Sequence, residues 1–289
     1  DHKEGLTYLW EPSRLSQQLS ASEQERLRML FESVESGNFE GELHLVATAD
    51  PQDEEESRRL LERLLELRRS RPQPARDDKI ITSWNALAGV GLLEAYRATG
   101  IDEYRRRAIA LHAALRAQNS VDGKLSHSSL PGRGVQETAF LEDYASLLLL
   151  ESYLLEEREI EAEEPAGTME ELLTFKNGSN WNSGITKDFF TMPSQVFDAP
   201  IPAAASLAEV ALLRTRLLLD EEYDELPPAR PHLADFYNLG ARFSAGELYV
   251  IKAPDRVEWA RLPFPAVQGR GEGENYCFRG VCYFGMPQS

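Results

Sequence analysis

The hydrophobic pattern is strongest in residues 76–98, where apolar side chains cover most of the circumference of one predicted helix. A helix that is apolar on nearly every side is normally buried on every side. The apolar positions are Ile80, Ile81, Trp84, Leu87, Val90, Leu92 and Leu93. Asp77 and Asp78 precede this run, and we expect them at the helix N-terminus, where anions stabilise the positive end of the helix dipole.

The same apolar pattern returns in residues 135–157 and 200–219. Amphipathic segments at 103–118, 169–175 and 231–242 follow the three apolar helices in turn. Alternation of buried and half-exposed helices at a period of about 55–65 residues predicts stacked helical hairpins, as in an α/α toroid. In such a toroid, polar residues at the starts of the inner helices converge on a central cavity.

We therefore predict a mostly α fold that forms one domain over residues 1–289, with an amphipathic helix at 53–69 before the apolar ones. Residues 247–252 and 276–284 have strand-like composition. We expect a small strand-containing tail, residues 243–289, packed on the helices.

The chain is acidic, with a net charge of −17 and a pI near 4.8. Such a surface repels phosphate groups, so we expect neither nucleic acid nor a membrane as a partner. The sequence has no apolar run of about 18 residues and no signal-peptide pattern, so we expect a cytoplasmic location. Because the chain opens on Asp1 rather than Met, we also expect an upstream segment.

Cys277 and Cys282 are the two cysteines, in a C-x4-C spacing without a nearby histidine. This is a weak metal signal, and two cysteines do not make a disulfide scaffold. We interpret both as ordinary buried small residues. The five histidines are scattered, so the sequence predicts no metal site and no cofactor.

Two stretches, DDKIITSWNAL at 77–87 and AFLEDYA at 139–145, resemble signatures of the spermatogenesis-associated protein 20 family, the bacterial YyaL-type proteins. Shorter stretches fall in the same order as in that family: GLTYLW near the start, GNFEG at 37–41, DFFT at 188–191 and YCFRGVC at 276–282. The resemblance implies a thioredoxin-like domain followed by a six-hairpin α/α toroid similar to N-acylglucosamine 2-epimerases and some glycosidases.

On this resemblance the chain is the later part of a six-hairpin toroid, a partial (α/α)6 fold, without the thioredoxin-like part. It departs from the family at Ala75, where relatives often have His, and at Pro202–Ser206, where relatives have a Pro-Ser-Gly-Asn-like stretch. An incomplete toroid exposes apolar helix faces, so we expect a homo-oligomer or the missing thioredoxin-like part as a partner.

Sugar epimerisation or glycoside cleavage needs a positioned acid and base, usually with aromatic platforms. Our candidate catalytic residues are Asp78, Glu142 and Asp143, since grouped carboxylates raise one another's pKa. The candidates for binding a sugar-like ligand are Asp77, Lys79, Trp84, Asn85, Glu137 and Tyr144. The alternative interpretation is structural, with these groups capping helices and bonding neighbouring helix ends.

Two functions therefore stay open. One is an enzyme-like toroid that acts on a carbohydrate or a similar polar small molecule, and it predicts a pocket lined by acids and aromatics. The other is a non-catalytic binding module that serves a thioredoxin-like redox domain, and it predicts an exposed apolar patch. Analogy with epimerases alone does not decide between them, because one fold hosts many activities.

Overall fold

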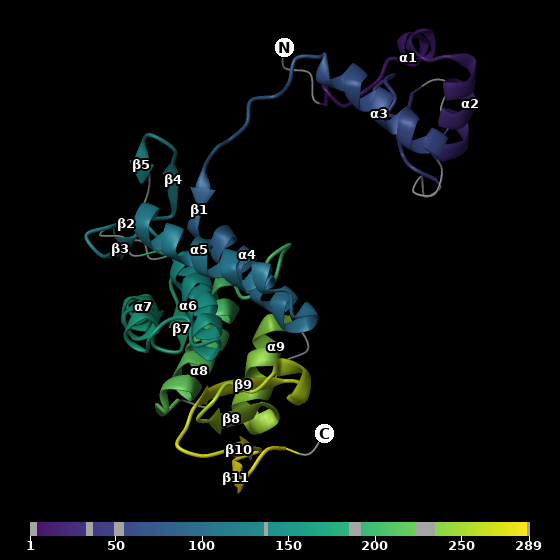
Figure 1. Cartoon of the computed structure of the whole chain (residues 1–289). Coiled ribbons are helices and arrows are strands. Elements are labelled where there is room, and N and C mark those ends of the chain that lie inside the picture. The colour runs from purple at the N-terminus through teal and green to yellow at the C-terminus, as the bar shows by residue number, and fades with distance from the viewer. Residues whose placement is uncertain are drawn as a thin grey trace. The chain divides into compact units, whose positions relative to one another are not determined.

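The computed structural model describes residues 5–32, 37–48, 55–135, 138–184, 192–223 and 235–287. The chain divides into two compact units, residues 1–77 and 78–289, where the sequence analysis expects one domain. Each unit has its own hydrophobic core. The fold is mostly helical with several small sheets, as predicted (Figure 1).

The first unit contains α1 (Pro12–Gln18), α2 (Ala21–Leu30) and α3 (Glu55–Arg69). α2 begins with a capping box, in which the Ser20 hydroxyl accepts from the Glu23 N–H and the Glu23 carboxylate accepts from the Ser20 N–H. Residues 5–8 form a turn, and a bridge joins Trp10 to Leu43. The core of this unit consists of Trp10, Leu15, Leu19, Leu30, Leu43, Leu60 and Leu64.

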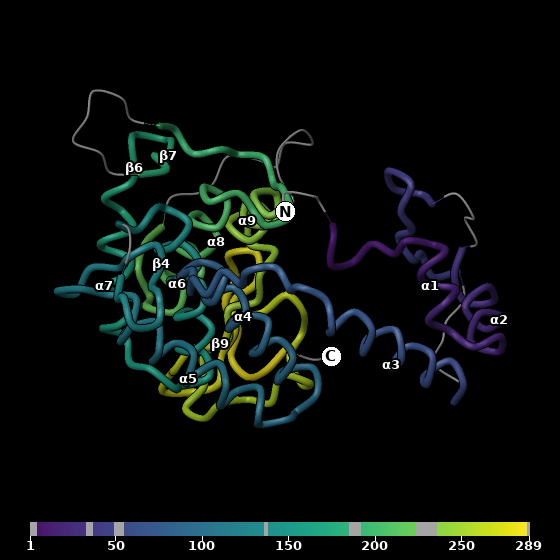
Figure 2. The backbone as a smooth tube through the Cα atoms, turned by 90° about the horizontal axis from the view of Figure 1, so that it is seen from above, coloured from purple at the N-terminus to yellow at the C-terminus, as the bar shows by residue number. Residues whose placement is uncertain are grey.

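The second unit is built on three successive helix pairs. They are α4 (Thr82–Thr99) with α5 (Asp102–Gln118), α6 (Leu141–Glu156) with α7 (Glu163–Leu173), and α8 (Ala204–Leu219) with α9 (Asp235–Arg242). The first helix of each pair is one of the predicted apolar helices. α6 packs against both α4 and α8, while α5 and α7 lie toward the outside (Figure 2).

Burial follows from this arrangement. Nearly every residue of α6 is buried, because α4, α7 and α8 cover it on different sides. Leu141, Leu147, Leu148, Leu150 and Leu154 of α6 are all fully buried. In the described part of the chain, none of the helices is long and apolar enough to cross a membrane.

Short strands connect the helices. β1 (Ile80–Ile81), β4 (Ser128–Leu130) and β5 (Gly134–Val135) form one small sheet, in the order β1-β4-β5. Two further hairpins are β2 (Ser120–Val121) with β3 (Lys124–Leu125), and β6 (Lys176–Asn177) with β7 (Asn180–Trp181). Each hairpin follows an outer helix and returns the chain to the start of the next inner helix.

The strand-containing tail is confirmed. A π-helical turn (Phe243–Glu247) leads into a sheet of β8 (Tyr249–Ala253), β9 (Ala266–Arg270), β10 (Asn275–Phe278) and β11 (Val281–Phe284), in the order β11-β10-β8-β9. β8 and β9 are parallel, and a 3-10 turn (Trp259–Arg261) lies between them. The sheet packs on α8 and α6 through β9.

The prediction for the two cysteines is wrong. Cys277 and Cys282 form a disulfide and lie opposite each other in the β10–β11 hairpin. Cys277 is half-buried and Cys282 is exposed, so neither is an ordinary core residue. The tight hairpin is the reason, because it brings their Cα atoms to 3.9 Å.

Candidate functional site

The start of α4 is fixed by the segment before β4. β1 pairs with β4 so that Ile81 lies opposite Ser128. The Thr82 N–H donates to the carbonyl of His127 at 2.9 Å, and the Thr82 hydroxyl donates to the carbonyl of Ser126 at 2.6 Å. His127 is thereby held beside the first turn of α4.

The start of α6 places a carboxylate at the same point. Asp143 lies in the first turn of α6 and is fully buried. Its Oδ2 accepts from the Phe140 N–H at 2.9 Å, which caps α6. Its Oδ1 accepts from the Ser83 N–H of α4 at 3.1 Å, so one carboxylate joins the starts of two inner helices.

Asp143 also pairs with His127. The distance from Nδ1 of His127 to Oδ2 of Asp143 is 2.9 Å, and Glu142 Oε1 lies 3.9 Å from the same nitrogen. The Phe140 ring meets the imidazole edge to face at a centroid distance of 5.0 Å. No hydrogen-bond partner of His127 Nε2 occurs among the described residues.

Burial raises the pKa of Asp143 from 3.8 to about 6, and hydrogen bonds from Phe140 and His127 offset only part of this rise. A carboxylate that accepts Nδ1–H fixes the imidazole tautomer and leaves the Nε2 lone pair outward. The pair can therefore take up a proton at Nε2 while Asp143 stabilises the resulting imidazolium.

In the part of the chain that the structure describes, three side chains at this point could hold a metal ion. His127, Glu142 and Asp143 offer ligand atoms within 4.8 Å of one another, a grouping that the sequence analysis does not predict. One imidazole and two carboxylates suit a divalent cation. Both Asp143 oxygens, however, already accept backbone N–H groups, so the geometry is better described as a hydrogen-bonded carboxylate–imidazole pair.

Three of the predicted binding residues lie on the same two helices. Trp84 follows Ser83 and is 61% exposed, as a ligand platform requires. Asn85 donates from its side chain to the Ile81 carbonyl at 2.8 Å. The buried Tyr144 hydroxyl accepts from the Leu125 N–H at 3.2 Å, and its ring packs on Phe175. Asn85 and Tyr144 therefore have structural partners, as the alternative interpretation expects.

The predicted role of Asp77 and Asp78 at the helix N-terminus is wrong. α4 begins at Thr82, and its N-cap Ile81 has no side-chain cap, because Ile80 and Ile81 are drawn into pairing with β4. Asp77, Asp78 and Lys79 are exposed residues ahead of β1, and Asp77 belongs to the first unit. Glu137 lies outside the described residues.

His127 is the residue of this site that sequence reasoning misses. The segment around it looks like a polar loop, and its partner Asp143 is 16 residues away. The available signal is the run of serines beside it, since Ser126, Ser128 and Ser129 are all buried. Small hydroxyl residues in a buried connection indicate close packing rather than an open loop.

Comparisons with known proteins give a relative but no activity. No family model matches the chain. Over 172 residues the chain is 32% identical to an uncharacterized protein of Caenorhabditis elegans. The alignment covers 55% of this chain and 24% of that protein, so the chain spans about a quarter of the length of this curated relative.

Proposed function

We propose that the second unit is part of an α/α toroid and that the mouth of its inner helices acts on a carbohydrate or a similar polar small molecule. The toroid interpretation is supported by the three helix pairs, in which α4, α6 and α8 pack against one another in sequence. The resemblance to the spermatogenesis-associated protein 20 family points in the same direction and remains part of this proposal.

The observation that carries the proposed activity is the His127–Asp143 pair. A fully buried carboxylate costs stability unless something compensates for it, and here its pKa rises to about 6. Perturbed carboxylates beside an imidazole occur preferentially at functional sites. Trp84 supplies an exposed aromatic face one residue from the Ser83 N–H that binds Asp143.

In the proposed chemistry His127 is the group that exchanges a proton with the ligand. Its Nε2 accepts the proton, and Asp143 holds Nδ1–H and stabilises the positive charge. Glu142, which is partly exposed beside the ring, is the candidate for the second acid/base group. Trp84 stacks on the apolar face of a sugar ring.

The test uses two substrate classes and one matched pair of variants. Nitrophenyl glycosides report glycoside cleavage, and deuterium uptake from heavy water into N-acetylglucosamine reports proton abstraction. His127→Gln keeps a hydrogen-bonding side chain and loses proton transfer, so the rate should fall by about a hundredfold or more. His44→Gln, in an exposed position of the first unit, should leave the rate unchanged.

A well-folded protein that neither cleaves nor exchanges any sugar, and whose melting temperature no sugar raises, would contradict this function. That result would favour the alternative, a non-catalytic module that binds a partner for a thioredoxin-like domain. Equal loss of activity in His127→Gln and His44→Gln would remove the imidazole from the mechanism.

A further inference from the structure

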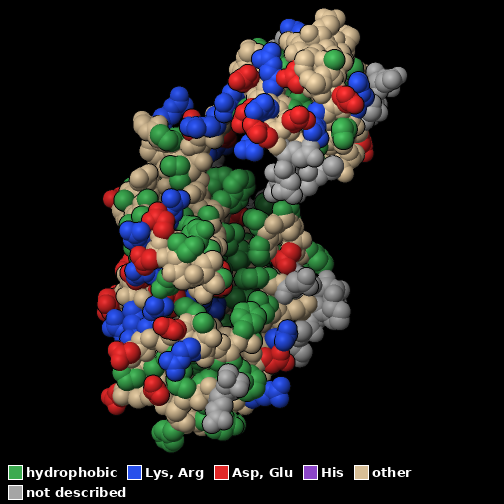
Figure 3. Space-filling model, turned by 45° about the vertical axis from the view of Figure 1, so that its right-hand side comes forward, with side chains coloured by type: hydrophobic (Ala, Val, Ile, Leu, Met, Phe, Trp, Pro, Cys, Tyr) green, Lys and Arg blue, Asp and Glu red, His purple; other side chains and the backbone are tan. Residues whose placement is uncertain are grey.

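A second site lies along the inner helices, from the start of α8 to the last turns of α4 and α6. A cavity of about 550 Å³ opens between α4, α6 and α8 on one side, and α9 and residues 259–266 on the other. Hydrophobic side chains gather on one face of the second unit, where its surface is hollowed (Figure 3). The volume falls in the range of pockets that bind small molecules, roughly 300–1,000 Å³.

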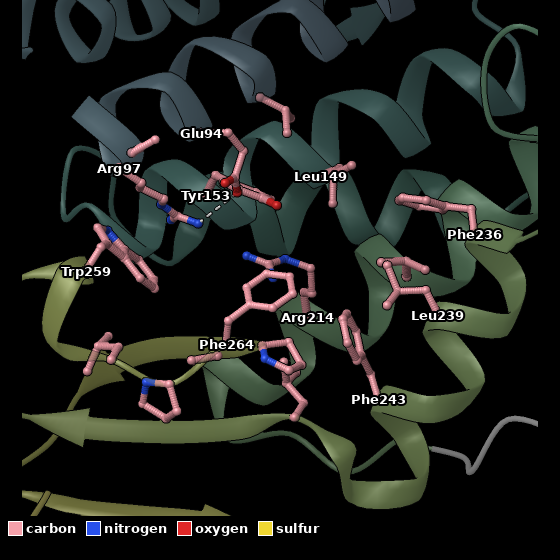
Figure 4. Close-up of a pocket in the computed structure, with 18 of the residues that line it drawn as sticks. Glu94, Arg97, Leu149, Tyr153, Arg214, Phe236, Leu239, Phe243, Trp259 and Phe264 are labelled. Carbon is pink, nitrogen blue, oxygen red and sulfur yellow. Dashed lines mark hydrogen bonds and ion pairs between the residues drawn. The ribbon is translucent and has the colours of Figure 1, made fainter. Parts of the chain in front are cut away.

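Two arginines and an aromatic ring form a stack at this cavity (Figure 4). Arg97 of α4 lies over the Tyr153 ring at 4.3 Å, and Arg214 of α8 lies over the same ring at 4.2 Å. Trp259 covers Arg97 at 3.8 Å. All four residues line the cavity, so its apolar wall is interrupted by positive charge at one place.

The charge of Arg97 is fully paired. Its guanidinium contacts Glu156 at 2.9 Å, Glu157 at 3.0 Å and Glu94 at 3.4 Å. Burial lowers the pKa of Arg97, but the Glu156 and Glu157 carboxylates outweigh it and the pKa is raised. Each of the three guanidinium nitrogens of Arg97 therefore already has a carboxylate partner.

Arg214 has one. Its Nη2 contacts Glu156 and its Nε donates to the Ser152 hydroxyl at 3.3 Å, while Nη1 has no partner among the described residues. The Arg214 side chain is only 6% exposed. A guanidinium that is nearly buried and lines a cavity, with one nitrogen that lacks a partner among the described residues, favours an oxygen acceptor from a ligand.

The rest of the cavity is apolar. Phe236, Leu239 and Phe243 line the side formed by α9 and the turn after it, and Leu149 faces them from α6 (Figure 4). Phe264, which also lines the cavity, is 93% exposed. An aromatic ring left in water at the edge of an apolar cavity gains from covering an apolar ligand.

We propose that this cavity binds an amphipathic monocarboxylate, with the carboxylate on Arg214 Nη1 and the apolar body along Phe236, Leu239 and Phe243. A single negative charge fits better than a phosphate, because Glu94 and Glu156 repel a dianion. The Arg214 end of the cavity is separate from the His127–Asp143 pair, since Asp143 and Tyr153, whose ring lies under Arg214, are ten positions apart on α6, about 15 Å along the helix.

The experiment compares octanoate with octan-1-ol by isothermal titration calorimetry on the whole chain. The two probes share an apolar body and differ in the charged head. A charge-assisted hydrogen bond to Arg214 should make octanoate bind about tenfold more tightly or better. Arg214→Lys keeps the charge beside Glu156 and should weaken octanoate by about tenfold, leaving octan-1-ol unchanged.

Two further variants complete the test. Leu239→Trp fills the cavity and should weaken both probes, and Arg106→Lys, exposed on α5, should change neither. Equal binding of the two probes, or octanoate binding that Leu239→Trp does not affect, overturns the proposal, as does the absence of octanoate binding. If Arg214→Lys does not fold, the comparison of octanoate with octan-1-ol and the effect of Leu239→Trp still test the proposal.

Discussion

Asp143 binds two backbone N–H groups and His127 at a position that water does not reach. Its pKa is raised from 3.8 to about 6, so between these values the folded state holds a proton that the unfolded state has lost. The stability that this group contributes is therefore fully present below about pH 4 and is lost as the pH rises through about 6.

We expect the free energy of unfolding to lose about 3 kcal/mol from this group between pH 4 and pH 7, at 1.36 kcal/mol per pKa unit. Asp143→Asn has no such titration, although it loses one acceptor and is less stable at every pH. The measurement is urea unfolding of both proteins at several pH values. A difference between them that stays constant with pH would contradict the raised pKa.

Glu156 is the carboxylate that joins the two arginines of the Arg97–Arg214 stack. It is fully buried, contacts both arginines and accepts from the Gln268 N–H at 3.0 Å. Glu156→Gln leaves buried positive charge uncompensated and should cost about 3 kcal/mol of stability. Glu161→Gln is the control, because Glu161 meets Arg270 at 3.7 Å on the surface and should cost less than about 1 kcal/mol.

If chemical denaturation gives Glu156→Gln and Glu161→Gln the same midpoint, the buried network does not hold the inner helices together. Salt separates the two cases further. Screening affects exposed pairs more than buried ones, so added sodium chloride should reduce the cost of Glu161→Gln and leave the cost of Glu156→Gln nearly unchanged.

At the scale of elements, α4 and α6 approach closely at one glycine. A Cβ atom on Gly89 would lie 2.9 Å from two methyl carbons of the fully buried Leu150. A Cβ on Gly91, two residues along the same helix, would meet nothing within 4 Å. Replacing either glycine with Ala gains the same helix propensity, but only the substitution at Gly89 meets a neighbouring side chain.

Gly91→Ala should therefore stabilise the protein by about 0.5–1 kcal/mol through the backbone alone. Gly89→Ala gains the same helix propensity, but overpacking of the α4–α6 interface costs about 1–3 kcal/mol of stability. Its net effect should therefore be destabilising. Thermal unfolding of both variants shows whether each substitution stabilises or destabilises the protein. Stabilisation by both substitutions would mean that Leu150 moves aside at little cost.

The helices could be predicted from the sequence because their signals are local. The apolar runs at 76–98, 135–157 and 200–219 and the amphipathic run at 103–118 correspond to α4, α6, α8 and α5. The short strands could not be predicted, because they depend on pairing between distant segments. The sequence pattern places Ile80 and Ile81 in the helix, but they form a strand because they pair with β4.

Part of the candidate site could be predicted from the sequence, because its signal is also local. Asp143 and Glu142 stand at the start of an apolar helix, where a cavity-facing carboxylate is expected. His127 becomes a partner only through the Thr82 contacts that hold the loop against α4. The pairing of Cys277 with Cys282 likewise depends on a hairpin register that spacing alone does not give.

At the scale of the whole molecule, the separate cores predict separate unfolding. Leu60 of α3 is 1% exposed in the first unit, and Leu148 of α6 is fully buried in the second. Leu60→Ala and Leu148→Ala should each cost about 2–5 kcal/mol, and each should lower one calorimetric transition without moving the other. A single transition that both variants shift would show that the units unfold together.

The stretch between the units has a practical consequence. Residues 72–79 are exposed at every position and form no helix or strand, and Arg76 and Lys79 are targets for trypsin. Proteases cut such segments before they cut packed helices. Brief digestion should thus release two resistant fragments, the larger beginning at Asp77 or Ile80, and that fragment contains every described residue of both proposed sites.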